Sequence, residues 1–416
     1  MLNDERTWRD WLDELSEELL PCFRSLWARE ERQTAKLLHF FREAGVGQHH
    51  FAPSTGYGLS DPGREALEFV FAGYFDTEAA LVRQQIVSGT HAINLCLQAL
   101  LAPGEEVLFL GLPYDTLQTA VGLRGKCPGS LAEKGVILRV WEPRAGWGRA
   151  AEELTTAIAS RTRLLYVQRS GGYTLRPALS VRTIAEIVKV ARAHSANPLV
   201  FVDNCYGEFV EDEEPTAVGA DLMAGSLIKN PGGGLCPSGG YIVGRKELVA
   251  RVAAQLYAPG LAGEMGPSLL SPRLFFQGFF QAPHLVAQAL QGAILCARAF
   301  AALGYEVSPS WDDPRADLVQ RLVFGSPEGI LAFARAIQAA SPVDARARPE
   351  PAPLPGYPDP VVMAGGTFVQ GSSGELSFDA PLRPPYVGYW QGGLSFAHTK
   401  LALAHGLATI NRGRHG

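Results

Sequence analysis

From about residue 84 to residue 243, short apolar runs alternate with segments of helical periodicity. Segments 91–101 and 181–194 are predicted helices, and in the second Ile184, Ile187 and Val188 fall on one helix face. Strands that alternate with helices predict an α/β fold with a mostly parallel sheet covered by helices, where ligands bind beyond the carboxyl ends of the strands. The runs read as strands are 85–87, 107–110, 136–138, 164–167, 199–202 and 241–243.

The segments on either side of this region have different patterns. Residues 7–45 predict two helices interrupted at Pro21. After about residue 285 the pattern predicts a helix at 285–303, a strand at 318–323, a helix at 328–340, a glycine-rich hairpin at 361–379 and a helix at 395–410. We therefore expect an N-terminal helical segment (1–50), a large α/β domain (51–285) and a smaller C-terminal α+β domain (286–416).

Composition narrows the partners and the compartment. The 416 residues are 47% hydrophobic and 19% charged, which is typical of a soluble globular protein, and no uninterrupted apolar run approaches membrane-spanning length. The net charge of -5 and the absence of a basic run argue against nucleic acid or a membrane as partner. The six cysteines lie far apart without a C-x-x-C pair, so we expect no disulfide framework, no metal site and a cytoplasmic location.

Lys229 is the first candidate for chemistry. It lies in Ser226-Leu227-Ile228-Lys229-Asn230-Pro231-Gly232-Gly233-Gly234, where an apolar approach places an amine at the edge of a glycine-rich turn. Partial burial lowers the pKa of an amine and makes it a nucleophile, as required of a lysine that bonds to the aldehyde of pyridoxal phosphate (PLP). A solvated lysine that closes a strand is the commoner explanation, so the other motifs must decide.

Two further features fit a PLP site. Ser88-Gly89-Thr90 opens a predicted helix, whose N-terminal amides and dipole stabilise a phosphate dianion, although an ordinary helix cap has the same sequence. Asp203 ends the apolar run 199–202 and therefore lies at the carboxyl edge of the predicted sheet. There a carboxylate can keep the pyridine nitrogen of PLP protonated, and the alternative explanation is a turn cap.

A phosphate-binding helix start, an aspartate at a strand end and a lysine before a glycine-rich turn follow one another in the order found in fold-type I PLP enzymes. The chain resembles that class from about residue 50 to the C-terminus. More narrowly, it is similar to the cystathionine β-lyase/methionine γ-lyase-related family, often labelled aluminium-resistance proteins. The resemblance lies in Ser54-Thr55-Gly56-Tyr57-Gly58, Val87-Ser88-Gly89-Thr90-His91-Ala92, segments 167–173, 202–209 and 226–234, and Tyr389-Trp390-Gln391-Gly392-Gly393-Leu394-Ser395.

This resemblance implies catalytic and cofactor-binding roles. Lys229 would bond to PLP and shuttle the α-proton of the substrate, and Asp203 would pair with the pyridinium nitrogen. Tyr114 would stack on the cofactor ring, or else be a buried core tyrosine. The remaining cofactor contacts would be Ser88, Gly89, Thr90 and Ser226 at the phosphate and Tyr206 at the phenolate oxygen.

The resemblance also implies how substrate and subunits are held. Arg383, between prolines, is the first candidate for the substrate carboxylate, and Arg169 is the second, although either can be a surface arginine. Tyr57 matches an aromatic residue that relatives send into the phosphate site of a neighbouring subunit. We therefore expect a homodimer or homotetramer with active sites at the subunit interface.

The activity implied is that of a PLP-dependent carbon-sulfur lyase, which eliminates a thiol from the β or γ carbon of an amino acid such as cystathionine or methionine. Two differences from the γ-lyases argue against assigning their substrate to this chain. Ile228 replaces a phosphate-binding threonine, and the Tyr-x-Arg segment of the γ-lyases is missing. An aminotransferase, an aldolase or a β/γ-replacement enzyme would use the same core. A PLP-binding regulatory protein without turnover is the alternative of a different class.

Overall fold

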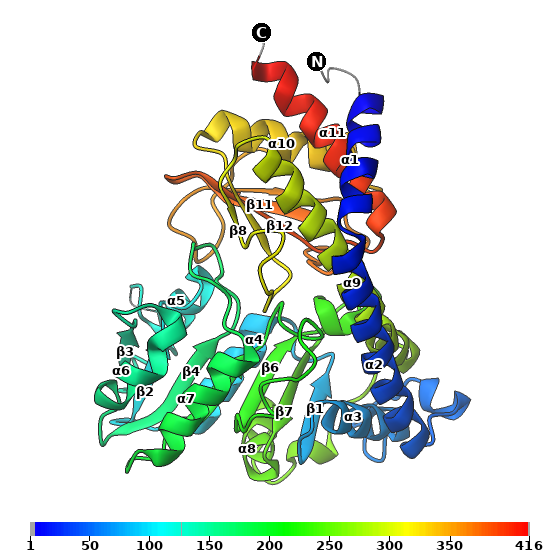
Figure 1. The fold of residues 1–416 in the computed structure, drawn as a ribbon. Helices are drawn as coiled ribbons and strands as arrows, with labels where there is room; N and C mark the ends of the chain where they lie inside the picture. Colours follow the sequence, from blue (N-terminus) through cyan, green and yellow to red (C-terminus); the bar gives the residue numbers. More distant parts are fainter. Residues whose placement is uncertain (1–4, 126, 415–416) are drawn as a thin grey trace.

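The structure is a computed structural model that describes residues 5–125 and 127–414. It contains two sheets, and the smaller lies above the larger in Figure 1. The large sheet has the order β1-β7-β6-β5-β4-β2-β3. Its five strands from β6 to β3 are parallel, whereas β7 is antiparallel to both β6 and β1. The strands are β1 (Ala79–Arg83), β2 (Glu106–Leu110), β3 (Ile137–Trp141), β4 (Thr162–Gln168), β5 (Leu199–Asp203), β6 (Leu222–Ser226) and β7 (Gly240–Gly244).

Helices cover both faces of this sheet because successive side chains of each buried strand point to opposite sides. In β2, Val107 and Phe109 pack with α4, α5 and α8, and Leu108 and Leu110 pack with the core that includes α3, α6 and α7. The helices are α3 (Pro62–Tyr74), α4 (Gly89–Leu100), α5 (Asp115–Val121), α6 (Ala150–Ala157), α7 (Val181–Ala193) and α8 (Lys246–Leu256). This arrangement confirms the predicted α/β class.

The small sheet is antiparallel, with the order β10-β11-β12-β9-β8, and lies above the carboxyl ends of the large sheet (Figure 1). Its strands are β8 (Val307–Ser308), β9 (Gln320–Val323), β10 (Val361–Ala364), β11 (Ser377–Pro381) and β12 (Val387–Gln391). One face packs on α10 (Pro327–Ala339), which in turn packs on α11 (Phe396–Arg414), and Phe378 and Trp390 are fully buried. The other face looks toward the large domain.

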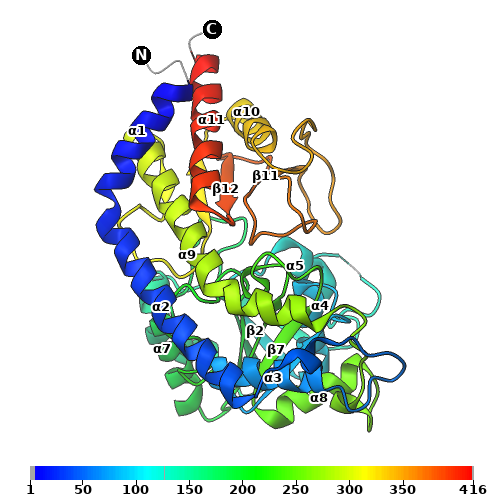
Figure 2. The same ribbon diagram turned by 90° about the vertical axis from the view of Figure 1, so that its right-hand side faces the viewer.

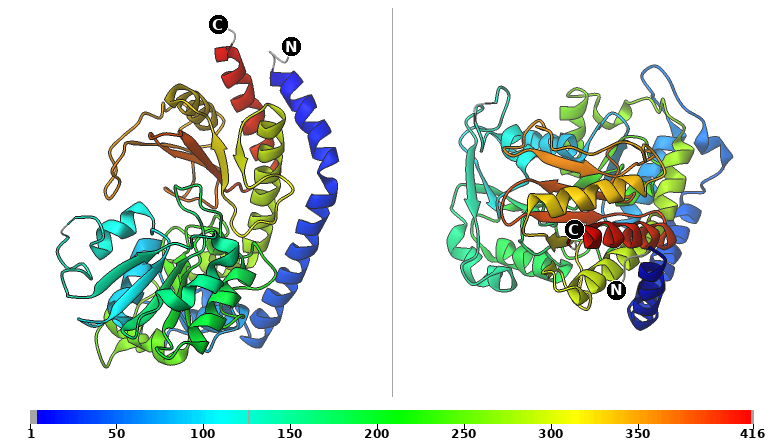
Figure 3. Two further views of the ribbon diagram at one scale, coloured as in Figure 1. Left: turned by 60° about the vertical axis from the view of Figure 1, so that its left-hand side comes forward. Right: turned by 90° about the horizontal axis from the view of Figure 1, so that it is seen from above.

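Three helices connect the two domains. Helix α9 (Pro272–Ala302) is shared by both cores, and the expected boundary at 285/286 falls inside it. Helices α1 (Glu5–Glu18) and α2 (Leu20–Glu43) form a nearly continuous rod, in which α1 packs on α11 and α2 packs on α9 (Figures 2 and 3). The predicted N-terminal segment is therefore fastened to both domains, and its residues 1–4 lie outside the described residues.

Helix α9 is long and apolar enough to cross a membrane, but 78% of its most apolar window is buried inside the protein. Such burial is typical of the core helix of a soluble fold. It also begins 13 residues before the predicted start at residue 285, because Gly278 and Pro283 interrupt the apolar pattern within it.

The prediction of a strand at 85–87 is wrong. The strand is β1, at 79–83, and residues 84–87 form the turn that leads into α4. This strand was not predicted because it ends in Arg83, and a charged residue argues against burial. The Arg83 side chain is nevertheless 2% exposed and forms an ion pair with Glu68. Strand β6 was also missed, because its sequence Leu-Met-Ala-Gly-Ser contains no β-branched residue.

Candidate active site

A cavity of about 260 Å³ lies where the carboxyl ends of the parallel strands face the small domain. The end bounded by the large domain, here called the large-domain end, is lined by Ser88, Gly89, Thr90, Asp203, Cys205, Ser226, Ile228 and Lys229. The opposite end, here called the small-domain end, is lined by Asp115, Thr116, Tyr173, Val319, Tyr357, Tyr389 and Gln391. Tyr114 and Tyr206 also line the cavity.

The N-terminus of α4 forms one wall of the large-domain end. The Ser88 hydroxyl caps the helix by accepting from the His91 amide at 3.0 Å, so the serine has the capping role that was weighed against phosphate binding. A Cβ atom on Gly89 would stand 3.2 Å from the Cys205 thiol and 3.4 Å from Ser226. Glycine thus leaves room at a helix N-terminus for an anionic group, as a phosphate site requires.

Asp203 ends β5 and is 3% exposed. Its carboxylate accepts from the Tyr166 hydroxyl at 2.9 Å and from the Cys205 amide at 3.1 Å. Burial raises the pKa of this carboxyl, while Lys229 and the two hydrogen bonds oppose the shift. A buried carboxylate of this kind is stabilised by a cationic partner such as a pyridinium. Tyr166 escaped prediction because it reads as an apolar member of strand β4.

Lys229 follows β6, and its ammonium lies 3.8 Å from the centre of the Tyr206 ring. Burial alone lowers the pKa of Lys229, but Cys205, Tyr206 and Asp203 raise it by more, so the pKa lies above its usual value. The expectation of a lowered pKa is therefore wrong for this protein, because that expectation considered burial without the acidic neighbours. Tyr206 presents its ring face to the amine and has a positive φ of 72°.

Tyr114 lies at the start of α5, where its amide donates to Gln168 at 2.8 Å. Its hydroxyl donates to the Thr90 side chain at 3.0 Å and so reaches the helix start of α4. Burial, followed by Asp203, raises the pKa of this phenol well above its usual value. Tyr114 therefore stays protonated and can serve as a proton donor inside the cavity.

At the small-domain end, three tyrosines from separate segments meet. The Tyr173 ring lies 5.8 Å from Tyr357 and 5.0 Å from Tyr389, measured between ring centres. Behind them, Asp379 accepts from the Tyr173 hydroxyl at 3.1 Å and from the Gln391 amide at 2.7 Å. Sequence reasoning missed this group as a site, although Tyr173 and Tyr389 belong to segments that carried the family resemblance.

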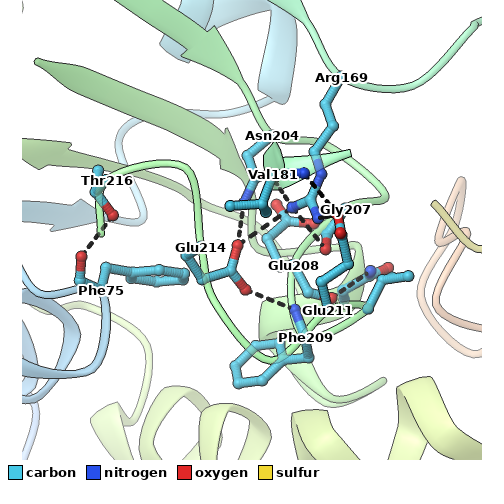
Figure 4. A network of polar contacts seen from close by, with 12 residues as sticks. Phe75, Arg169, Val181, Asn204, Gly207, Glu208, Phe209, Glu211, Glu214 and Thr216 are labelled. Atoms are coloured by element: carbon cyan, nitrogen blue, oxygen red, sulfur yellow. Dashed lines mark hydrogen bonds and ion pairs between the residues drawn. The ribbon is translucent and has the colours of Figure 1, made fainter. Parts of the chain in front are cut away.

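Arg169 is not placed to bind a substrate. Its side chain is fully buried and does not line the cavity. The guanidinium donates to Asn204 at 2.7 Å and Glu211 at 2.7 Å, and it pairs with Glu214 at 3.3 Å (Figure 4). These bonds hold the loop that follows Asp203, so the interpretation of Arg169 as a carboxylate ligand is not supported by the structure.

Two other arginines lie close to the small-domain end without lining the cavity. Arg383 is one-third exposed, pairs with Asp359 at 3.1 Å and lies 3.9 Å from Asp115. Arg321 stands opposite Tyr389 in the β9–β12 pair, and its buried Nη2 atom has no hydrogen-bond partner. Arg321 was missed, although it is the one charged residue in the predicted strand 318–323.

The residues at the large-domain end suit PLP by their chemistry. The helix start at Gly89 and the Ser226 hydroxyl can bind its phosphate, Asp203 its ring nitrogen and Lys229 its aldehyde carbon. Among residues 5–125 and 127–414, no group of three or more His, Cys, Asp and Glu side chains could hold a metal ion. Tyr57 lies away from this cavity and is 72% exposed.

A lysine and an aspartate at the carboxyl edge of a mostly parallel sheet, facing a helix N-terminus, define the fold-type I class of PLP-dependent enzymes, whose fold this chain has. Within that class, residues 9–411 match the profile of the methionine gamma-lyase family, and the chain belongs to that family.

Solved structures similar to this chain include two Listeria proteins named as candidate cystathionine beta-lyases involved in aluminium resistance. The Listeria monocytogenes protein is 45% identical with a TM-score of 0.91, covering 97% of this chain and 100% of the other. The Listeria innocua protein is 46% identical with a TM-score of 0.92, covering 98% and 99%. More distantly, an L-methionine gamma-lyase of Pseudomonas putida is 31% identical over 219 residues, which are 51% of this chain and 47% of the relative.

Proposed function

We propose that this protein is a PLP-dependent carbon-sulfur lyase that eliminates a thiol from the β or γ carbon of a sulfur-containing amino acid such as cystathionine or methionine. The observation that carries the proposal is the meeting of Lys229, Asp203 and the N-terminus of α4 in one cavity. Membership in the methionine gamma-lyase family supports the lyase reaction over the other reactions that this core can perform.

The large-domain end would hold the cofactor through residues already in place. Gly89, Thr90 and Ser226 would bind the phosphate, Asp203 would pair with the ring nitrogen, and Tyr114 would pack on the ring, since all of them line the cavity. When bound, PLP supplies a ring that accepts the electron pair left at the substrate α-carbon. A pyridinium nitrogen beside the buried Asp203 carboxylate would neutralise its charge and offset part of its desolvation cost.

Lys229 then carries the protons. Its amine would take the α-proton in its neutral form, and it lines the cavity in which the substrate would lie. Tyr114 keeps its phenolic proton because burial raises its pKa, and it can deliver that proton to the departing sulfur. Both groups face the same cavity, so one substrate can reach both.

Arg383 remains our first candidate for the substrate carboxylate. It lies at the rim of the small-domain end, and rotation away from Asp359 would free a guanidinium fork for a carboxylate. Arg321 is the second candidate, because its buried Nη2 atom has no hydrogen-bond partner and is held by an ion pair with Asp317 at 3.6 Å. Arg321 lies behind Gly171, since a Cβ atom on Gly171 would meet its Nη2 at 2.5 Å.

We also propose a homodimer or homotetramer that works in the cytoplasm. Exposed apolar side chains gather on segments that are hydrogen-bonded to one another, as shown by the bonds from Ser54 to Ser268 and from Gln85 to Pro267. Tyr57 lies on this surface, where its carbonyl accepts from the Gly266 amide at 3.0 Å and its exposed ring could contact a second subunit. The exposed side chains are Tyr57, Leu59, Val87, Leu261 and Leu269.

A substrate panel tests the reaction. Protein loaded with PLP is incubated with cystathionine, methionine, cysteine and serine, and thiol, keto acid and ammonia are measured for each. We expect thiol and keto acid to appear in equal amounts from at least one sulfur amino acid. Keto acid formed from a sulfur amino acid without thiol and without ammonia would indicate an aminotransferase, because the amino group would remain on the cofactor. No product despite bound cofactor would indicate a regulatory protein.

A further inference from the structure

Glu208 carries a buried carboxyl group that the proposed mechanism does not use. It belongs to the loop after Asp203 that Arg169 holds (Figure 4), is 0% exposed and does not line the cavity. Its Oε1 atom accepts from the Tyr241 hydroxyl at 2.7 Å, whereas its Oε2 atom is buried without a hydrogen-bond partner. A buried carboxylate with an unsatisfied oxygen is costly, which favours the protonated form of the group.

Aromatic side chains and backbone surround this carboxyl. Tyr241 stacks on Phe75 with the ring centres 5.4 Å apart, and Phe209, the residue after Glu208, lies 6.4 Å from the same Phe75 ring. A Cβ atom on Gly225 would stand 2.6 Å from the Glu208 Oε1 atom, so glycine lets strand β6 pass directly against the carboxyl. Burial in these surroundings raises the pKa of Glu208 to about 8, while the Tyr241 hydrogen bond opposes the shift.

Two structural links connect Glu208 to Lys229. The Glu208 carbonyl accepts from the side-chain amide of Asn230 at 2.9 Å, and Asn230 directly follows Lys229. Gly225, which packs against the carboxyl, lies in the strand that leads to Lys229. The positive charge of Lys229 lowers the pKa of Glu208, so the two groups interact electrostatically. By the same coupling, an ionised Glu208 stabilises the charged form of Lys229.

The other ionisable groups around Glu208 keep their charge state near neutral pH. Glu214 raises the pKa of Glu208, but its own carboxylate is paired with Arg169 at 3.3 Å. Cys205 and Tyr241 stay protonated, because burial raises the pKa of both groups well above their usual values. A change of charge near pH 8 at this place is therefore a change at Glu208.

We propose that Glu208 is a positioning residue that stays protonated at neutral pH and controls how readily the Lys229 nitrogen gives up its proton. While Glu208 is neutral, its charge does not hold a proton on Lys229, and the neutral amine that takes the α-proton forms more easily. Once Glu208 ionises, it favours the protonated form of Lys229. This inference rests on the role of Lys229 in the proposed function and adds a group that regulates that residue.

The absorption of the bound cofactor tests the coupling without turnover. Protein loaded with PLP is titrated with base in the absence of substrate, because the absorption of PLP bonded to a lysine changes when the shared nitrogen loses its proton. Glu208→Gln keeps the shape of the side chain but cannot ionise. We expect the midpoint to fall by about 0.5 pH unit or more in this variant, because the carboxylate that stabilises the protonated nitrogen is gone.

Two further variants separate an electrostatic role from a structural one. Tyr241→Phe removes the donor to Glu208, so the carboxyl ionises at higher pH and the midpoint should fall in the same direction. Adding Tyr241→Phe to Glu208→Gln should shift it no further. Glu106→Gln is the matched control, since Glu106 is a buried carboxylate at the start of β2 that accepts from Arg139 and Thr162. It should lower stability and leave the midpoint unchanged.

Infrared spectroscopy measures the charge of Glu208 itself in protein without cofactor. At about pH 6, the carbonyl band of protonated carboxyl groups should be weaker in Glu208→Gln than in the unaltered protein. The difference should disappear as the pH rises above about 8, because Glu208 then loses its proton in the unaltered protein.

The outcomes separate this inference from the proposed reaction. If Glu208→Gln leaves the absorption midpoint unchanged, or if the infrared difference is absent at about pH 6, the role of Glu208 is wrong even when thiol release is observed. Should Glu208→Gln not fold, an unchanged midpoint in Tyr241→Phe has the same meaning. If the midpoint falls as expected but no sulfur amino acid yields thiol, the role of Glu208 stands and the proposed lyase reaction fails.

Discussion

The two ends of the cavity are built in different ways. The large-domain end takes its groups from strand ends and a helix start of one sheet, so each group is fixed by its own short segment. The small-domain end takes three tyrosines from three segments. One of them, Tyr357, is placed there because the connection between α10 and β10 docks beside α5, where the Gly356 carbonyl accepts from Thr119 and Arg124. The difference teaches that the end proposed to hold the cofactor is fixed by local structure, whereas the opposite end depends on how distant segments assemble.

The sharpest way to break the large-domain end is Lys229→Ala. If Lys229 bonds to the cofactor and carries the α-proton, its loss should lower kcat by about 10³-fold or more. Borohydride should fix PLP to the unaltered protein, as read by the mass of the peptide that contains Lys229, and not to the variant. Lys246→Ala, an exposed lysine of α8, is the control. Retained turnover in Lys229→Ala would overturn the assignment of this end.

Arg169→Met tests whether the loop after Asp203 needs its buried cation. The change leaves the Glu214 carboxylate, 4% exposed, without its ion-pair partner. We expect the free energy of unfolding to fall by about 3 to 5 kcal/mol, measured by urea denaturation. Arg182→Met, an exposed position on α7, should change it by less than about 0.5 kcal/mol. A small loss in Arg169→Met would show that the loop is held by other contacts.

Arg383→Ala examines the small-domain end. If this arginine binds the substrate carboxylate, KM should rise by about 10-fold while kcat changes by less than about 3-fold. Steady-state kinetics with the best substrate of the panel measures both constants. Arg298→Ala removes a partly exposed arginine of another ion pair, with Glu18 at 3.0 Å, and should leave KM unchanged because Arg298 does not line the cavity. An unchanged KM in Arg383→Ala would make Arg321 the remaining candidate.

Asp379→Asn should have the smallest effect, which is a change in how the free energy of unfolding depends on pH. Burial raises the pKa of Asp379 to about 7, while Tyr173 and Gln391 oppose the shift. A carboxyl with a raised pKa binds its proton more tightly in the folded state, so its contribution to stability is present below about pH 4 and is lost as the pH rises through about 7. Unfolding measured from pH 4 to 8 should lose that slope in the variant, and an identical slope would contradict the assignment.

The large-domain end could be predicted because each of its residues lies in a short sequence pattern that indicates its position in the fold. Asp203 closes an apolar strand, Ser88 and Gly89 start a helix, and Lys229 precedes a glycine-rich turn. The fold class followed from the same alternation of strands and helices. This reasoning did not include the combined electrostatic effect of the groups around Lys229. Burial alone predicts a lowered pKa for Lys229, and the surrounding acidic groups reverse that shift.

The small-domain end could not be predicted in the same way. Tyr357 follows a proline-rich loop that reads as surface, and nothing near it indicates that Gly356 docks on Thr116. The two arginine candidates show the same limit. A sequence gives the charge of Arg169 and Arg383 but not their partners, and the partners make Arg169 a structural residue.

Helix α9 couples the unfolding of the two domains. Its side chains belong to both cores, and Phe279 packs with aromatic residues of the large domain, whereas Phe300 packs on Phe333 of the small domain. If one domain melted, half of this helix would lose its cover and expose buried apolar surface, which would destabilise the other domain. Heat and denaturant should therefore unfold the chain in one cooperative transition, and neither half cut out at residue 285 should fold alone.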